Sequence, residues 1–416
     1  MSKRKTVLVI GTLDTKEEEI LFIEKLIKKR GFDVIIMDTG IQRPSHYNKK
    51  SQVDDSNIIF VMSDNSSKTN LFTKEKYLNA VIEGGKVLIN SFYINEKIDG
   101  VLGIGGGTGT SIGTAIMKVL PRGIPKIMVS TVATGTTQCG SLFGTNDITV
   151  MHSVVDLQGI NSFTARIMSN SVGAICGMVN AYKKEKIEKY SKGKMVVALS
   201  MMGTTTLGAL RAKSILENKG FQVISFHQNG TGGIAMEEMI EDGIFQGVFD
   251  LSIHEVGDRE LGGLHGAVKP VRLETAGRKG IPQVVAPGCI VYYVAGPLES
   301  LSPETKKRKY FVHSPQLTLV RATPDELAKI GIVVAHKLNS ATGPLKVFIP
   351  LKGFCSPDKK GLELYEPEGN IAFINSLKDK LNSSISLIEV DAHINDAIFI
   401  DLMVEEFIKI MNDYLT

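Results

Sequence analysis

Apolar runs alternate with amphipathic segments from the start of the chain. Residues 5–11 (KTVLVIG) form an uninterrupted apolar run, which is typical of a strand buried on both faces of a parallel sheet. Residues 15–31 carry isoleucines at helical spacing, acidic residues in the first turn and basic residues before Gly31, and so predict a helix. A second apolar run, residues 32–38, completes a β-α-β unit whose crossover should be right-handed.

The same alternation continues through the first half of the chain. Strands are predicted at 99–105, 126–132 and 147–156, and helices at 76–96, 108–120 and 161–184. The pair Gly84–Gly85 leaves open a break in the first of these helices. Residues 41–75 are polar and rich in Asn and Ser, and they predict an irregular excursion at the edge of the sheet.

The second half of the chain repeats the first. When residues 5–35 are placed over 194–224, Lys5 falls on Lys194, Gly31 on Gly220 and Phe32 on Phe221. Residues 123–135 likewise resemble 280–288, because each segment begins at the end of a predicted helix and continues into a strand and a glycine-containing loop. We therefore predict an α/β fold of two similar doubly wound, mostly parallel-sheet (Rossmann-like) domains, residues 1–190 and 191–416. A strand at 386–396 and a helix at 397–415 close the second domain.

Composition narrows the class of protein. The chain has 416 residues, more than the about 250–300 that a single core usually holds. Its net charge of +4 comes without a basic block, so we expect no nucleic-acid partner. There is no apolar segment of 18 residues and no signal-peptide pattern, so we expect a cytoplasmic protein without a membrane partner. The four cysteines form no C-x-x-C pair, which argues against a structural zinc site.

Four predicted strand ends in the first domain carry residues suited to anion binding. These ends are residues 11–16, 38–40, 103–111 and 130–137. In open parallel α/β sheets, ligands bind outside the carboxyl ends of the strands, so the four loops should share one edge.

The loop after the first strand suits a phosphate. Gly11 permits close backbone approach, while Thr12, Thr15 and Lys16 supply donors at the start of a helix, where free amides and the helix dipole favour an anion. Asp14 is expected to be the N-cap residue of that helix. In the alternative interpretation, Asp14 orients Lys16 or holds Mg²⁺ through water.

The loop after the second strand contains Asp38 and Thr39. Asp38 stands where an acidic residue can accept a hydrogen bond from a ribose hydroxyl. A turn-forming aspartate before Gly40 explains the same residue equally well.

The third loop combines glycines with hydroxyls. Gly105, Gly106, Gly107 and Gly109 allow close approach of a ligand to the backbone, and Thr108 and Thr110 can donate to phosphate oxygens. The spacing fits neither G-x-G-x-x-G nor G-x-x-x-x-G-K-[ST]. Tight packing of strand on helix is the alternative explanation of the glycines. Thr131, Thr134 and Gly135 from the fourth loop are candidates to complete a nucleotide site.

The second domain carries different groups at the matching positions. His254 and Glu255, followed by Asp258 and His265, suggest either a divalent metal site or proton transfer to a substrate, although the H-E-x-x-H helix pattern is absent. His313 is a further proton-transfer candidate. Arg321 is expected either to clamp a carboxylate or phosphate or to form a surface ion pair.

Several unusual motifs in this order resemble the Tm-one-like ATP-binding domain family, which also occurs in a plant tobamovirus-resistance protein. They are 9-VIGTLDTK-16, 38-DTG-40, 103-GIGGGTGTS-111, 130-STVATG-135, 278-RKGIPQVVAPG-288, 313-HSPQLTLVRATPDE-326, 338-LNSATGP-344 and 349-IPLKGFCSPD-358. The resemblance implies two α/β subdomains, self-association into a homo-oligomer, and ATP with Mg²⁺ bound by Gly11, Thr12, Asp14, Thr15, Lys16 and the 105–110 loop. Residues 265–272 (HGAVKPVR) depart from the S-A-G-P-D-R-like stretch of the family.

These observations lead to one main hypothesis and two alternatives. The main hypothesis is an ATP·Mg²⁺-dependent enzyme that acts on a small carboxylate or carbonyl metabolite at the domain cleft, with Lys16 stabilising phosphate charge. His254, Glu255 and His313 are then the proton-transfer candidates. The first alternative is a nucleotide-sensing or partner-binding module without turnover, and the second is an NAD(P)-dependent oxidoreductase.

Overall fold

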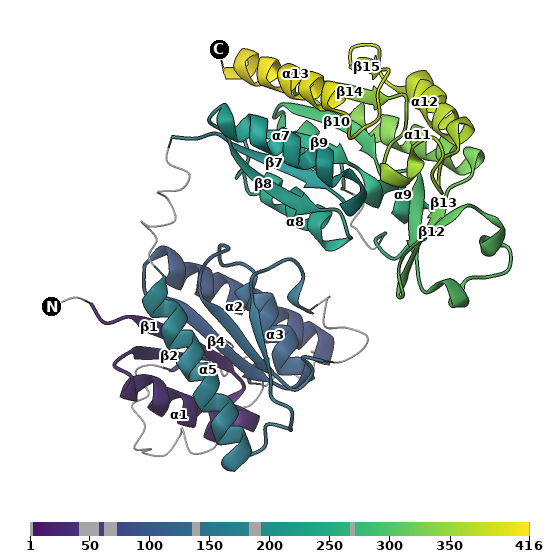
Figure 1. Ribbon diagram of the computed structural model, residues 1–416. Coiled ribbons are helices and arrows are strands. Elements are labelled where there is room, and N and C mark those ends of the chain that lie inside the picture. The colour runs from purple at the N-terminus through teal and green to yellow at the C-terminus, as the bar shows by residue number, and fades with distance from the viewer. Residues whose placement is uncertain are drawn as a thin grey trace. The chain divides into compact units, whose positions relative to one another are not determined.

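The computed structural model describes residues 3–40, 58–61, 73–134, 142–182, 193–266 and 271–415. The chain divides into two compact units, Met1–Ile187 and Glu188–Thr416, and each is described by itself (Figure 1). Within the described residues, no helix is both long and apolar enough to cross a membrane.

The first unit is built on a parallel sheet. Its strands are β1 (Thr6–Gly11), β2 (Asp33–Asp38), β3 (Ile58–Phe60), β4 (Gly100–Gly105), β5 (Lys126–Ser130) and β6 (Thr149–His152). Across the sheet they lie in the order β3-β2-β1-β4-β5-β6, and every neighbouring pair is parallel. The chain therefore builds outward in one direction from β1 to β3, and then returns to the other side of β1 with β4.

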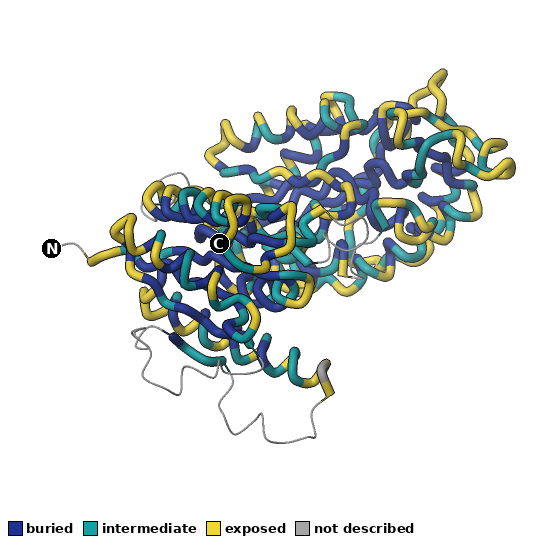
Figure 2. Tube along the Cα trace, turned by 90° about the horizontal axis from the view of Figure 1, so that it is seen from below, coloured by how far each residue is buried: buried dark blue, intermediate teal, exposed yellow. Residues whose placement is uncertain are grey.

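Helices cover both faces of this sheet. Helices α1 (Leu13–Lys29) and α5 (Ser162–Ala181) pack on one face, while α2 (Lys74–Ile94) and α3 (Gly107–Met117) pack on the other. Strand β1 shows why both faces are apolar: Val7 and Val9 enter the α1–α5 core, and Leu8 and Ile10 enter the α2–α3 core. Figure 2 shows the buried residues, in dark blue, gathered on the inner parts of the trace and the exposed ones, in yellow, on its outer turns.

The second unit has its own sheet and an additional small one. The main strands are β7 (Val196–Met201), β8 (Gln222–His227), β9 (Gly247–Ser252), β10 (Gln283–Gly288), β14 (Leu345–Pro350) and β15 (Ser386–Val390). They lie in the order β15-β14-β10-β9-β7-β8 and are parallel. Between β10 and β14 the chain forms an antiparallel sheet, β11-β13-β12, from β11 (Tyr292–Ala295), β12 (Tyr310–Ser314) and β13 (Leu317–Arg321).

Helices again cover both faces of the main sheet. On one face lie α7 (Thr206–Asn218) and α13 (Ala397–Leu415). On the other face lie α8 (Thr231–Glu241), α10 (Thr275–Lys279), α11 (Pro324–Leu338) and α12 (Pro367–Lys380) (Figure 1). A short helix, α9 (His254–Glu260), follows β9 at its carboxyl end.

The repeat read from the sequence has a structural cause. Gly31 and Gly220 both adopt positive φ, 85° and 92°, at the turn between the first helix and the second strand of each unit. The aromatic residues that follow them, Phe32 and Phe221, are buried in the cores. The predicted fold class, two doubly wound parallel-sheet units, is confirmed, although the strand orders differ and the β11-β13-β12 sheet was not predicted.

Some local predictions were wrong. Helix α1 begins at Leu13 with Thr12 as its N-cap residue, so Asp14 lies inside the first turn and is not the N-cap. Helix α2 runs without a break through Gly84–Gly85. Gly85 serves helix packing instead: a side chain there would meet Ile116 Cδ1 at 2.3 Å, so glycine lets α2 approach α3. The strands expected at 126–132 and 147–156 are shorter, ending at Ser130 and His152.

Two helical glycines should respond oppositely to alanine. A Cβ at Gly331 in α11 would lie 2.6 Å from the carbonyl oxygen of Phe373 in α12, so Gly331→Ala should destabilise the second unit by about 1–3 kcal/mol. Gly177 in α5 is exposed with nothing within 4 Å, so Gly177→Ala should stabilise the first unit by about 0.5–1 kcal/mol. Urea unfolding followed by circular dichroism measures both. Equal effects of the same sign would contradict the α11–α12 contact.

Candidate functional site

The four loops of the first unit follow neighbouring strands. Strand β1 pairs with β2 and β4, and β4 pairs with β5, with Gly11 opposite Asp38 and Gly105 opposite Ser130. Because these strands are parallel, their carboxyl ends open onto the same edge, and the strand order reverses between β1 and β4. Such a reversal is where open α/β sheets place ligands.

The β1–α1 loop has an irregular first turn. The amides of Thr15 and Lys16 both donate to the Thr12 carbonyl, at 3.2 and 2.8 Å, and the Thr12 and Thr15 hydroxyls lie 2.7 Å apart. Lys16 leaves the helical region, with φ −135° and ψ 26°, so α1 is kinked at this residue. Thr15 is exposed and Lys16 half-buried, so both lie on the accessible side of the loop.

Asp38 and Thr39 tie β2 to this loop. Asp38 Oδ1 accepts hydrogen bonds from the amides of Leu13 and Gly40, each at 2.9 Å, and Thr39 donates both its amide and its hydroxyl to the Gly11 carbonyl. Both residues are 3% exposed. The structure thus gives Asp38 the turn-forming role, and it places Asp38 and Thr39 beneath the loop, where they shape it.

Asp14 lies beside this turn. A Cβ on Gly40 would be 3.0 Å from carboxylate oxygens of both Asp14 and Asp38, so the two acids are neighbours. Tyr77 of α2 donates to the Gly40 carbonyl at 2.8 Å, and its pKa is raised to about 12, first by burial and then by the two carboxylates. Among the described residues, no three His, Cys, Asp or Glu side chains are placed to hold a metal ion by themselves.

The glycine loop between β4 and α3 divides into packed and open positions. A Cβ at Gly105 would lie 2.7 Å from Gly109 Cα, so packing of the helix on the strand explains that glycine. At Gly106 and Gly107 the nearest atoms to an added Cβ are 3.7 and 4.0 Å away, and neither residue has positive φ. Within the part of the chain that the structure describes, neither packing nor backbone conformation therefore requires glycine at Gly106 or Gly107.

The hydroxyls at this edge also fall into two groups, buried and accessible. Thr110 is fully buried and its hydroxyl lies 2.7 Å from that of Ser130, beneath the loop. Thr108 and Thr134 are exposed and Thr131 is half-buried, whereas Gly135 lies outside the described residues. Helix α3 begins after Gly106 without a side-chain cap, so the amides at the start of its first turn have no intrahelical partner.

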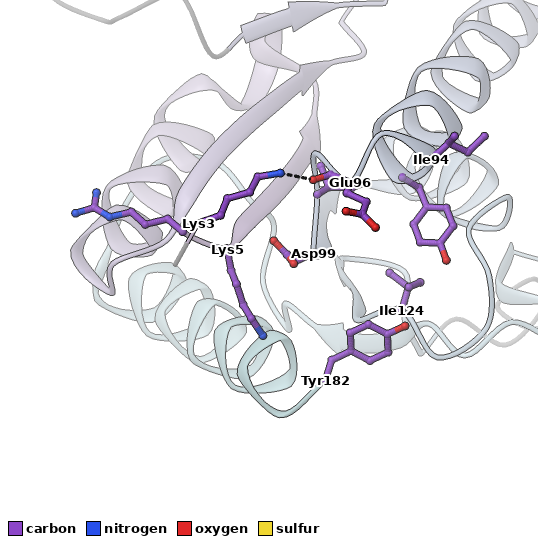
Figure 3. Close-up of a pocket in the computed structure, with 10 residues that line it drawn as sticks. Lys3, Lys5, Ile94, Glu96, Asp99, Ile124 and Tyr182 are labelled. Carbon is purple, nitrogen blue, oxygen red and sulfur yellow. Dashed lines mark hydrogen bonds between the residues drawn. The ribbon is translucent and has the colours of Figure 1, made fainter. Parts of the chain in front are cut away.

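The first unit also has a hollow at the opposite edge of the sheet. This cavity, about 560 Å³, lies at the amino ends of the strands, beside Lys3, Lys5 and Asp99 (Figure 3). Lys3 and Lys5 each donate to a backbone carbonyl at 2.6 Å, of Glu96 and Val179. The glycine loop is therefore not part of this hollow, and the location argues against a ligand site of the usual α/β kind.

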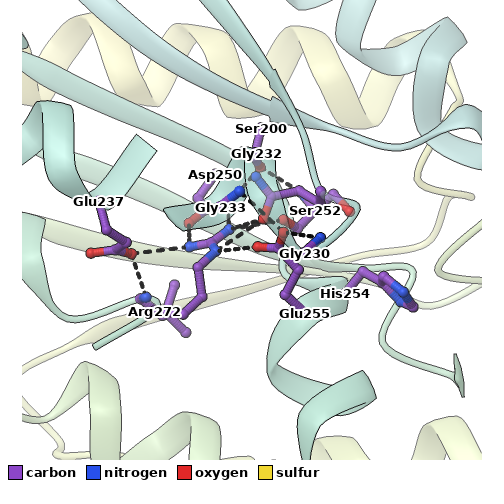
Figure 4. A network of polar contacts seen from close by, with 12 residues as sticks. Ser200, Gly230, Gly232, Gly233, Glu237, Asp250, Ser252, His254, Glu255 and Arg272 are labelled. Carbon is purple, nitrogen blue, oxygen red and sulfur yellow. Dashed lines mark hydrogen bonds and ion pairs between the residues drawn. The ribbon is translucent and has the colours of Figure 1, made fainter. Parts of the chain in front are cut away.

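The second unit centres its polar contacts on Arg272, which is 2% exposed. Its guanidinium makes a two-pronged pair with Asp250, at 2.7 and 2.9 Å, and contacts Glu255 and Glu237 at 3.3 and 3.4 Å (Figure 4). Burial alone would lower the pKa of Arg272, but the three carboxylates outweigh it and hold that pKa above its usual value. The cluster joins β9, α8 and α9 to residues 271–275.

Glu255 belongs to this cluster and not to an accessible site. Its Oε1 accepts from the amides of Gly230 and Gly233 at 2.7 and 3.1 Å, while Oε2 contacts Arg272. The residue is fully buried, and burial raises the pKa of its carboxyl despite Arg272 and the two amides. The structure assigns Glu255 to holding the 230–233 turn, which replaces the proton-transfer role expected from the sequence.

Arg321 also has a structural place. It is 2% exposed, pairs with Asp358 at 3.1 Å and donates to Asn370 at 2.6 Å. The expectations of a surface ion pair and of a ligand clamp were both wrong, because the guanidinium is buried between β13, α12 and the 356–358 turn.

Of the histidines singled out in the sequence, one is buried and the others are accessible from a cavity. His254 is fully buried, whereas His265, His313 and a residue not predicted, His227, line a cavity of about 200 Å³ together with Tyr292. The repeat contained a signal for His227, because it occupies in 194–227 the position that Asp38 occupies in 5–38, the carboxyl end of the second strand. Tyr292 had no such signal, since it comes from the inserted sheet.

The molecule has two doubly wound units with polar, glycine-containing loops at the carboxyl ends of their strands. It falls in the class of Rossmann-like two-domain α/β proteins. The chain belongs to UPF0261: residues 5–184 match "Uncharacterised protein family (UPF0261) N-terminal domain", and 194–411 match its C-terminal domain. A UPF0261 protein of Clostridium tetani is 38% identical over 98% of this chain and 99% of its own length.

A plant relative confirms the resemblance inferred from the motifs. The ToMV resistance protein Tm-1(GCR237) of Solanum lycopersicum is 31% identical over 98% of this chain, which spans 56% of that protein. Among solved structures, MurG of Acinetobacter baumannii matches 99% of this chain and 92% of its own chain at 12% identity, with a TM-score of 0.24.

Removing the central cation should strongly destabilise the second unit. Arg272→Met would leave Asp250, Glu237 and Glu255 buried without a counter-charge, so the free energy of unfolding should fall by about 3–5 kcal/mol. Arg278→Met is the matched control, because that arginine pairs with Glu241 at the surface and its loss should change little. Urea unfolding of both variants measures the difference, and similar stabilities would show that the buried cluster is not central.

His254 should stay neutral in acid. Burial lowers its pKa to about 3, and His265 and His227 add to this effect while the Cys289 carbonyl opposes it. Because the folded-state pKa lies below the unfolded value, the neutral ring contributes stability above about pH 6.5 that is lost as the pH falls toward about 3. Imidazole ¹⁵N NMR should show no protonation of His254 down to about pH 4. A midpoint near that of the urea-unfolded chain would contradict its burial.

Proposed function

We propose that the first unit binds ATP with Mg²⁺ at the edge formed by the β1–α1 and β4–α3 loops. We also propose that the chain is an ATP-dependent enzyme of phosphoryl transfer or hydrolysis, acting on a small carboxylate or carbonyl metabolite. The observation that supports this most is the pair Gly106 and Gly107: their lack of side chains leaves open the space over the first turn of α3. A close-approaching phosphate accounts for glycine where packing and φ do not.

The residues present at this edge fit a triphosphate. The first-turn amides of α3 and the exposed Thr108 hydroxyl supply donors on one side, and Thr15 and Lys16 supply a hydroxyl and a positive charge on the other. Asp14, beside Asp38, suits a Mg²⁺ ion that keeps its waters, since that ion is commonly held by one or two carboxylates together with phosphates. When bound, the nucleotide supplies the phosphoryl group, and Lys16 offsets the negative charge that develops on it.

A side chain in the open part of the loop should block nucleotide binding without unfolding the unit. Isothermal titration of the wild type with ATP and Mg²⁺ should give saturable binding, and Gly107→Val should weaken it by more than about tenfold because its side chain fills the space over α3. Lys16→Ala should weaken it by about tenfold.

Gly177→Ala, an exposed change on α5, is the control and should bind like the wild type. Wild type that takes up no ATP, or Gly107→Val that binds normally, would refute the site. Binding without any ATP consumption across a panel of carboxylate and carbonyl metabolites would leave the binding site but favour a nucleotide-sensing module.

A further inference from the structure

The second unit contains a separate cavity of about 200 Å³ at the carboxyl ends of β7 and β8. Strand order reverses here too, since β8 lies on one side of β7 and β9 on the other. The inserted β11-β13-β12 sheet forms a wall of this cavity and contributes Tyr292, His313 and apolar residues such as Leu319. Its volume is below the about 300–1,000 Å³ of sites for drug-sized ligands, which suits a small metabolite.

A chain of hydrogen bonds sets the proton positions on two histidines. His254 Nδ1 lies 3.0 Å from the carbonyl oxygen of Cys289, which can only accept, so this nitrogen must carry the proton. The neutral ring then has a bare Nε2, which lies 3.2 Å from Nδ1 of His265. His265 must therefore donate from Nδ1, and its own Nε2 is left with a lone pair.

The surrounding structure holds this arrangement in place. Asp258 accepts from the amides of His265 and Val294 at 2.7 and 2.6 Å, which fixes the backbone of His265 against β11. The other candidate donor–acceptor pair, His254 Nε2 with Asp258 Oδ1, is 3.5 Å apart, longer than its contact with His265. Tyr292 packs its ring on His254 at a centroid distance of 4.9 Å and restricts that ring further.

The rest of the described lining is rich in donors and contains no carboxylate. His227, His313, Asn229, Thr204 and Tyr292 line the cavity with His265, and the hydroxyls of Thr204 and Tyr292 lie 3.2 Å apart. Burial, and after it the neighbouring imidazoles, lower the pKa values of His227 and His265, which favours the neutral form of both rings and keeps the lone pair on Nε2 of His265. The described side chains also form no group suited to a metal ion, which leaves an organic anion as the fitting ligand.

We propose that this cavity binds a small hydroxycarboxylate, with the carboxylate held by the imidazole and hydroxyl donors and the hydroxyl hydrogen-bonded to Nε2 of His265. His265 is the residue that selects for the hydroxyl, because the lone pair on its Nε2 can only accept a hydrogen bond. His254 is a positioning residue that keeps the proton of His265 on Nδ1. The site lies wholly in the second unit and does not depend on nucleotide binding by the first.

The first test reads the tautomers directly in the full chain without nucleotide. Long-range ¹H–¹⁵N spectra of imidazole-labelled protein should show both His254 and His265 protonated on Nδ1. His254→Gln should preserve this state at His265, because a glutamine amide can donate to Cys289 and accept from His265. His254→Leu should allow the Nε2–H form. A wild-type His265 protonated on Nε2 overturns the proposal.

The second test uses a matched pair of probes, malate and succinate, which differ by one hydroxyl. Malate should bind about three- to tenfold more tightly than succinate, as expected for one hydrogen bond to His265. His265→Asn should remove that preference, and the exposed His336→Asn should keep it. No binding of malate, no preference for it, or a stoichiometric zinc ion in the purified chain would each overturn the proposal, whatever the result with ATP.

Discussion

All neighbouring strands of the two main sheets are parallel, and this constraint organises everything else in the molecule. Parallel strands deliver their carboxyl ends to one edge, so residues far apart in the chain, such as Ile10 and Gly103, become neighbours through backbone pairing. The cost is that both faces of each sheet must be apolar and covered by helices. Polar chemistry is thereby confined to the edges, and above all to the points where the strand order reverses.

The two units use this edge differently. In the first unit the carboxylate of Asp38 turns inward to backbone amides, and the accessible groups are glycines, hydroxyls and Lys16. In the second unit an entire buried ion cluster around Arg272 supports the edge from below. That support leaves the accessible surface of the cavity to imidazoles and hydroxyls. Under the two proposals made above, the repeated scaffold offers an edge for phosphate in one copy and an edge for a small organic acid in the other.

Local patterns predicted the regular elements well. Helix α13 was expected with the bounds that the structure shows, since residues 397–415 are a long amphipathic stretch. Glycines at positive φ, such as Gly31 and Gly220, made the repeat visible because each ends a helix. The carboxyl-edge loops also followed from the strands, because topology alone brings consecutive parallel strands to one edge.

Long-range contacts set the limits of that prediction. The roles of Glu255 and Arg321 depend on burial and on partners, Arg272 and Asp358, that spacing in the sequence does not indicate. The β11-β13-β12 sheet comes from an insertion that has no counterpart among the described residues of the first unit, so Tyr292 could not be placed at the cavity. Asp14 was mistaken for an N-cap residue because Thr12, two residues earlier, offers the same kind of side chain.

The central claim, that the open glycine edge of the first unit receives phosphates, is tested most directly by hydrogen–deuterium exchange of the full chain with and without ATP and Mg²⁺. The account predicts slower exchange of backbone amides in residues 11–16 and 105–110 when the nucleotide is present. Unchanged exchange in both segments at saturating ATP, or protection confined to the second unit, would contradict it.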